Sequence, residues 1–240
     1  MVFGLRAVVE ALRSEKEIEK VLIKRNLEGD LLGELMKAVK EREIPFQFVP
    51  IEKINKITTK NHQGILAFIS PVEYQQLEQV VPMVFEQGQN PFFLVLDHIT
   101  DVRNFGAIVR SAECAGVQAV IVPEKGAAQM NDDAIKTSAG AMFNINICRV
   151  RSLEGALKYL SQCGIQIVAA TEKGKMSYLR PDYTLPTALV MGAEDTGISA
   201  DLLKIIEHWV NIPLHGKIES LNVSAAATVM MYEVVRQRGL

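Results

Sequence analysis

The sequence predicts an α/β protein: a parallel-sheet domain preceded by a smaller α/β domain. From residue 90 onward, short apolar runs alternate with amphipathic helical segments, which is the pattern of parallel strands covered by helices on both faces. Over residues 1–70 the same alternation occurs in a shorter stretch and ends at Ser70-Pro71, which favours a separate small domain. The chain has 240 residues, of which 48% are hydrophobic, so it can bury two cores of this size.

The first domain is expected to span residues 1–70. Helical spacing predicts helices at 4–12, 31–42 and 51–57, and apolar runs predict strands at 21–23, 45–50 and 64–69. Alternation in the second of these strands puts Phe46 and Phe48 on one face. Residues 71–90 are expected to form a partly helical linker, because Pro82 interrupts their helical spacing and Gly88, Asn90 and Pro91 then break the chain.

The second domain is expected to span residues 91–240. Strands are predicted at 92–97, 117–122, 144–148, 165–170, 187–191 and 209–212. Helices are predicted at 104–115, 131–139, 152–163, 199–207 and 222–237. The sequence lacks both the G-x-G-x-x-G dinucleotide fingerprint and a P-loop lysine motif, so a Rossmann-type cofactor site is not expected.

Charge and cysteine content narrow the functional class. Residues 1–70 carry 12 basic and 10 acidic side chains (+2), and residues 71–240 carry 14 and 18 (−4), so an RNA partner would need local basic patches, with the first domain the better place for them. The three cysteines match no zinc spacing and suggest buried thiols in a reducing cytoplasm. No apolar run approaches the roughly 20 residues of a membrane span, so we expect a soluble cytoplasmic protein.

Three motifs occur in order in the second domain, each next to a predicted strand end. They are Asn104-x-Gly106-x-x-x-Arg110, Gly192-x-Glu194 with Gly197, and Ile212-Pro213 with Ser220-Leu221-Asn222-Val223-Ser224. Loops at strand ends that expose backbone and small side chains form ligand sites in open α/β folds, although most single Gly-rich strand ends are ordinary turns that bind nothing. Together they predict a binding site.

In residues, order and spacing, these motifs resemble the SpoU (TrmH) branch of the SPOUT RNA 2'-O-methyltransferases, over about 150 residues from Asn90 onward. Residues 3–12 and 61–64 resemble the substrate-binding domain of the same branch, nearest to members that methylate a guanosine of 23S rRNA. The resemblance implies a C-terminal trefoil knot, an L30e-like first domain, S-adenosyl-L-methionine as cofactor, no metal, and a homodimer with the site near its interface. Periodicity alone predicts no knot.

Four residues are the expected cofactor contacts. Gly192 ends a strand where a side chain would block the adenosine, so Gly192→Val is expected to abolish binding and leave the fold intact. Ile212 and Leu221 flank the second loop and would hold the adenine through backbone amides and apolar contact. Thr171, at the end of the strand at 165–170, faces the same expected pocket.

The catalytic candidates are Arg110, Glu194, Asn222, Asn104 and Ser224. Arg110 is expected to bind a phosphate and orient the ribose 2'-hydroxyl, or to accept the proton of that hydroxyl as proposed for the family. The structural alternative is an arginine paired with a carboxylate. Glu194 would orient Asn104 or Arg110, or be a solvated loop residue. Asn222 and Ser224 stand where such residues cap helices in any protein.

The sequence does not exclude two other functions. The substrate could be tRNA, although the tRNA enzymes of this branch typically lack such a first domain; or the protein could be a non-catalytic RNA-binding assembly factor on the same fold. His62 fits an RNA contact and a hydrogen-bonded structural histidine about equally well.

Overall fold

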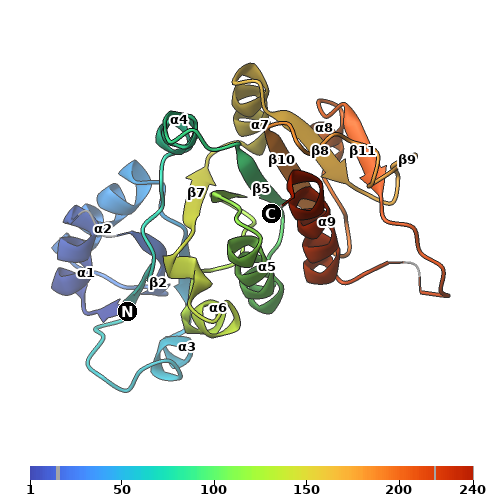
Figure 1. Cartoon of the computed structure of the whole chain (residues 1–240). Helices are drawn as coiled ribbons and strands as arrows, with labels where there is room; N and C mark the ends of the chain where they lie inside the picture. The colour runs from blue at the N-terminus through green and yellow to red at the C-terminus, as the bar shows by residue number, and fades with distance from the viewer. Residues whose placement is uncertain (15–16, 219, 240) are drawn as a thin grey trace. The chain divides into compact units, whose positions relative to one another are not determined.

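The computed structural model describes residues 1–14, 17–218 and 220–239, which form two compact units, 1–73 and 74–240 (Figure 1). Both are α/β, as predicted. None of the helices in the described ranges is long and apolar enough to cross a bilayer.

The first unit is built on a four-stranded sheet with the order β1-β4-β2-β3, in which only β2 and β3 are parallel. Its elements are β1 (Val2–Phe3), α1 (Leu5–Arg13), β2 (Ile18–Lys24), α2 (Asp30–Glu41), β3 (Phe46–Val49), α3 (Ile51–Asn55) and β4 (Ile65–Ile69). Helices α1 and α2 bury one apolar face against the sheet through Val8, Leu12, Leu35 and Val39. Ile54 of α3 packs on the other face. The six elements predicted from the sequence are all present, with shifted ends.

Two features of this unit differ from expectation. The two-residue strand β1 is too short to show a period, and β2 extends well beyond the predicted 21–23. Phe46 and Phe48 do share a face, but they stand on the edge strand and remain partly exposed, with their ring centroids 5.8 Å apart in an edge-to-face pair.

The second unit is built on a seven-stranded sheet with the order β7-β6-β5-β10-β8-β11-β9, and every pairing in it is parallel. Its strands are β5 (Phe92–Asp97), β6 (Ala119–Pro123), β7 (Asn146–Val150), β8 (Gln166–Ala170), β9 (Met176–Ser177), β10 (Thr187–Gly192) and β11 (His208–Asn211). Strand β10 lies between β5 and β8, and Gly192 pairs with Asp97 at the carboxyl end. The ends of strands far apart in the chain therefore meet at one edge of the sheet.

Helices cover both faces of this sheet (Figure 1). They are α4 (Leu77–Glu86), α5 (Val102–Cys114), α6 (Asp132–Thr137), α7 (Leu153–Gln162), α8 (Ala200–Leu203) and α9 (Val223–Arg238), with a 3-10 turn at Ala141–Phe143. Helix α8 is shorter than the predicted 199–207. Gly106 of the first motif allows α5 to approach α6, because a Cβ there would lie 2.7 Å from Thr137 Cβ.

Helix α4 lies within the segment expected to be a linker, residues 71–90. Leu77, Val80, Val81 and Val84 are buried in the same core as Phe93 of β5, so this segment contributes to the second unit. Sequence spacing gave the helix but not its burial, because an amphipathic stripe does not identify the surface that covers it.

Arg238, near the end of α9, anchors that helix to the strand entrances. Its guanidinium donates hydrogen bonds of 2.9 Å to the carbonyls of Tyr183, Asn90, Pro91 and Leu185. The last turn of α9 therefore fastens the chain where β5 and β10 begin.

Candidate functional site

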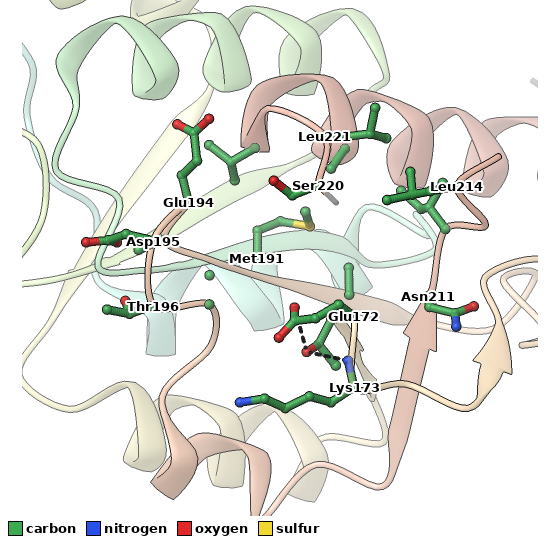
Figure 2. A pocket seen from close by; sticks show the side chains of 18 residues that line it. Glu172, Lys173, Met191, Glu194, Asp195, Thr196, Asn211, Leu214, Ser220 and Leu221 are labelled. Carbon is green, nitrogen blue, oxygen red and sulfur yellow. Dashed lines mark hydrogen bonds between the residues drawn. The ribbon is translucent and has the colours of Figure 1, made fainter. Parts of the chain in front are cut away.

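A cavity of about 520 Å³ opens at the carboxyl ends of β8, β10 and β11 (Figure 2). In Figure 2, Glu194, Asp195 and Thr196 line one side, Asn211 and Leu214 the opposite side, and Ser220 and Leu221 a third. Open parallel sheets bind ligands at this edge, where helices and loops diverge. The structure thus forms a pocket of the size that small ligands occupy.

All four expected cofactor residues line this cavity. Thr171 follows β8 and is held there by a bond from its N–H to the carbonyl of Val210, 2.9 Å. Ile212 directly follows β11, and Leu221 precedes α9 with 39% of its surface exposed, so its apolar side chain is free to meet a ligand. Gly192 ends β10.

The reason for glycine at position 192 differs from the expected one. A Cβ there would lie 2.1 Å from Gly197 C, 2.2 Å from Ile198 N and 2.4 Å from Gly197 O. A side chain would thus collide with the backbone of its own loop rather than occupy the ligand's place. The expectation that Gly192→Val leaves the fold intact is therefore wrong, because residue 192 must let residues 193–198 fold back over it.

Two hydrogen bonds hold this loop. The N–H of Gly197 donates to the carbonyl of Ala193, 2.9 Å, and the N–H of Ser199 donates to Asp97 Oδ2, 2.7 Å. Asp97 is 1% exposed, and its other oxygen contacts His98 Nδ1. Motif spacing gave no reason to single out Asp97, although a carboxylate that ends an otherwise apolar strand is a usable signal.

Four of the five catalytic candidates form one polar network. Asn104 Nδ2 donates to Glu194 Oε2, 3.2 Å, and Asn222 Nδ2 donates to Asn104 Oδ1, 3.0 Å, and to Glu194 Oε1, 3.5 Å. Asn222 also caps α9, since its Oδ1 accepts from the N–H of Ser224, 3.0 Å, and from its hydroxyl, 2.5 Å. The network joins the three sequence motifs in space.

A second hollow of about 420 Å³ adjoins the first on the side of this network. It is lined by His98, Ile99, Thr100, Asp101 and Asn104, and it shares Ala193, Glu194, Asp195 and Val223 with the first cavity. Glu194 and Asp195 therefore stand on a partition between two compartments. Such an arrangement can hold two reactants side by side and orient one toward the other.

Arg110 lies outside both compartments. It follows Asn104 by six residues on α5, which is about 9 Å along the helix axis and roughly 120° around it. Its side chain is exposed, and in the described part of the chain it has no hydrogen-bond or ion-pair partner, so pairing with a carboxylate does not account for it. The neighbouring Ser111 hydroxyl accepts from Thr228 of α9, 2.9 Å, which locates Arg110 beside the α5–α9 contact.

Among the residues outside the site, His62 has a structural role. Its Nδ1 accepts from the N–H of Gly64, 3.0 Å, and its Nε2 donates to Asn55 Oδ1, 2.8 Å, so both ring nitrogens of the buried imidazole are in use. Of the cysteines, only Cys148 is buried, whereas Cys114 is exposed, which corrects the expectation of buried thiols. Burial raises the pKa of Cys148 to about 12, with a contribution from Glu78, so this thiol is no nucleophile.

No group of three or more His, Cys, Asp or Glu within the described ranges could hold a metal ion. The two compartments offer amide, carboxylate, hydroxyl and apolar groups, together with the ammonium of Lys173 and the imidazole of His98. These groups can bind, orient and polarise reactants.

Comparison with known families decides the class of protein. Residues 91–232 match the SpoU rRNA Methylase family, and residues 1–75 match the family of RNA 2'-O ribose methyltransferase substrate-binding domains. The chain belongs to the SpoU rRNA Methylase family. The resemblance carried by the three motifs is thus confirmed.

Some relatives of this SpoU methylase span nearly the whole chain, and others span about two thirds of it. YacO of Bacillus subtilis, whose name assigns it to the TrmH family of tRNA/rRNA methyltransferases, is 31% identical over 237 residues, 99% of this chain and 95% of the relative. The AdoMet-bound rRNA methyltransferase of Sinorhizobium meliloti is 25% identical with a TM-score of 0.63, covering 98% of this chain and 86% of that one. The TrmH/SpoU tRNA modifying enzyme of A. aeolicus is 29% identical with a TM-score of 0.57, covering 68% and 84%.

Proposed function

We propose that this protein is an S-adenosyl-L-methionine-dependent RNA methyltransferase that methylates a ribose 2'-hydroxyl of 23S rRNA at a guanosine, the activity of the RlmB branch of the family. One observation supports this most directly: a cavity large enough for the cofactor adjoins a second hollow across Glu194. The reaction needs a donor and a ribose held side by side, which two adjoining compartments permit.

The larger cavity is the proposed cofactor site. Its volume of about 520 Å³ suits a small ligand, and its lining alternates apolar groups such as Leu221 and Met191 with polar ones. Glu172, Glu194 and Asp195 supply three carboxylates against the single ammonium of Lys173, which favours a ligand with cationic groups. S-adenosyl-L-methionine supplies an electrophilic methyl group when bound, and the chain's task is to bind and orient it.

In the smaller hollow, the amide–carboxylate network would position the RNA. Asn222 donates one amide group to both Asn104 and Glu194, so the three side chains hold one another in place. We assign Glu194 and Asn104 to orienting the target nucleotide, and Ser224 to fixing Asn222 through its contact with Oδ1. Such preorganisation lowers the cost of reaching the reactive geometry.

Arg110 would act at the ribose through a second copy of the chain. The exposed face of α9 carries Ala225, Val229 and Tyr232 at helical spacing, with Val229 36% and Tyr232 48% exposed. An apolar stripe of this kind on a long helix favours a homodimer. Because α5 packs on α9 next to Arg110, a partner across this stripe would lie beside the unpaired guanidinium. Arg110 can then hold a phosphate bidentately and stabilise the 2'-oxyanion as its proton leaves.

The choice of rRNA over tRNA rests on the first unit. The rRNA methyltransferase of Sinorhizobium meliloti matches 98% of this chain, whereas the tRNA modifying enzyme of A. aeolicus matches 68% of it. A protein that works on large-subunit rRNA would act in the cytoplasm. We further propose, from the resemblance of the motifs to the family, that the first unit is L30e-like and that the last third of the second unit is knotted.

Methyl transfer from labelled S-adenosyl-L-methionine to 23S rRNA and to bulk tRNA, together with mapping of 2'-O-methyl groups in cells with and without the gene, tests this function. One guanosine of 23S rRNA should lose its modification in the deletion strain. Loss of a 2'-O-methyl group at a tRNA position would show that the substrate is tRNA and not 23S rRNA. Absence of both transfer and cofactor binding by calorimetry would favour a non-catalytic RNA-binding protein.

A further inference from the structure

We propose that one end of the first unit, formed by Lys24, Arg25, Lys53, Lys56 and Lys60 and here called the basic end, binds the phosphate backbone of the RNA substrate. This inference rests on the proposed function, since it names the surface of the protein that grips the RNA. The charge difference between residues 1–70 and the rest of the chain favours RNA binding by the first unit but does not identify the residues.

The five cations belong to segments that meet at one end of the sheet. Lys24 closes β2 opposite Val49, the last residue of β3, and Arg25 follows it. Helix α3, with Lys53 in its last turn and Lys56 as its C-cap, begins directly after β3. Because β2 and β3 are parallel, their carboxyl ends and the segments after them lie together.

The loop that carries Lys60 returns to the same end. It leads into β4, which runs antiparallel to β2 with Ile65 opposite Ile23. Gly64, just before that strand, is close enough that a Cβ on it would lie 3.0 Å from Lys24 Cβ. The ammonium of Lys60 lies over the Phe3 ring, 5.5 Å from the ring centre, and this cation–π contact holds the side chain at that end.

Among the residues that the structure describes, these five cations have no acidic partner. Arg6, Lys20 and Lys40 of the same unit have none either, so what distinguishes the five is that they gather at one end of the sheet. Elsewhere in the unit, Arg13 pairs with Glu34 and Lys37 with Glu41. At the basic end, all five side chains are exposed, and none is paired with a carboxylate in the residues that the structure describes. Residues 53–64 contain three lysines and no acidic residue. Exposed cations left unpaired by their own protein are available to a polyanion.

The loop is held by other groups, so the lysines are not needed to order it. His62 bonds Asn55 and Gly64, and Gln63 Oε1 accepts from the N–H of Leu5, 3.0 Å. A preordered loop loses little conformational entropy when it binds. RNA is the occupant that fits, because residues 1–75 match an RNA 2'-O ribose methyltransferase substrate-binding family and phosphate contacts need charge rather than shape.

The test measures RNA affinity against salt concentration for the full-length protein, with 23S rRNA as probe and bulk tRNA as a second arm. The variant is Lys53→Gln/Lys56→Gln. The matched control is Lys37→Gln/Lys40→Gln, which also removes two exposed lysines from one helix of the same unit. Thermal unfolding and S-adenosyl-L-methionine binding confirm that both variants are folded.

The Lys53→Gln/Lys56→Gln variant should lower the slope of log affinity against log salt by about 1.4 to 1.8, from about 0.7–0.9 for each lost phosphate contact. Its affinity at low salt should fall on the order of tenfold, while the control keeps its slope within about 0.5. Adding Arg25→Gln should lower the slope further. If the unsubstituted protein methylates RNA but the variant and the control lose the same RNA affinity, the basic end is refuted and the proposed function stands. If only the variant loses RNA affinity but the unsubstituted protein transfers no methyl group, the basic end is supported and the proposed function is refuted.

Discussion

Replacing Gly192 by alanine should damage the loop that walls the cofactor cavity, even though alanine is the smallest possible addition. The new Cβ would stand 2.1 Å from Gly197 C, and ordinary van der Waals contact begins at 3.4 Å, so the loop must retreat by about 3.4 − 2.1 = 1.3 Å. Both partners of the clash are backbone, which cannot rotate away as a side chain could.

The cost follows from what that retreat breaks. A movement of this size stretches the 2.9 Å bond between Gly197 and Ala193 and the 2.7 Å bond from Ser199 to Asp97. Each loss leaves a polar group short of a partner at about 1–3 kcal/mol, so the two losses should lower the free energy of unfolding of Gly192→Ala by about 2–6 kcal/mol. For a domain of this length, that corresponds to a drop in Tm of about 4–24 °C.

Thermal unfolding and calorimetric titration with S-adenosyl-L-methionine measure the two consequences. Cofactor affinity should fall at least on the order of tenfold, because residues 192–197 line the cavity. Gly216→Ala is the control, since no heavy atom lies within 4 Å of the added Cβ there. A Gly192→Ala protein with the stability and cofactor affinity of the Gly216→Ala control would refute the reasoning.

Substitutions at three further positions test other parts of the molecule. Arg110→Ala should reduce turnover on the order of a hundredfold or more with cofactor affinity unchanged, and Arg110→Lys should also turn over slowly, because an ammonium cannot bind a phosphate through two parallel N–H groups as a guanidinium does. The control is Arg180→Ala, which removes another exposed arginine, and near-normal methylation by Arg110→Ala would show that Arg110 takes no part in the reaction. Asn222→Asp keeps the oxygen that caps α9 but loses the amide donor to Asn104 and Glu194, so turnover should fall on the order of a hundredfold. Unchanged turnover together with an unchanged Tm would indicate a capping role alone. Arg238→Ala should lower the free energy of unfolding by about 3–5 kcal/mol in denaturant titrations, whereas Lys204→Ala, which breaks a fully exposed ion pair, should leave the midpoint nearly unchanged. Equal midpoints for the two variants would contradict the anchoring role.

Much of the architecture could be predicted because the local spacing of apolar residues indicates where helices and strands lie. The apolar runs of the second unit became buried parallel strands, and the alternation of elements gave the parallel sheet. Periodicity does not give strand order, so the insertion of β10 between β5 and β8 could not be inferred from it. Strands of two residues, such as β9, are too short to have a period.

Part of the candidate site could also be predicted from the sequence and part of it could not. Motif order brought together Asn104, Glu194 and Asn222, which the fold joins by hydrogen bonds. Motif spacing put Arg110 on the same helix as Asn104 but did not show which way it faces, because six residues along a helix turn its side chain about 120° from that of Asn104; its catalytic role stays a prediction. Motif spacing misread Gly192, since a glycine required by its own loop and one required by a ligand look the same in a sequence.

The grip of Arg238 on the carbonyls of Asn90 and Pro91 has a consequence for synthesis of the chain. Residues 90 and 91 lead into β5, which is made early, whereas Arg238 is made after every strand of the sheet. The entrance to β5 therefore lacks these hydrogen bonds while the ribosome adds the following residues, and the second unit reaches its full stability only when residue 238 has emerged. Until then its apolar strands are more exposed to association with other chains.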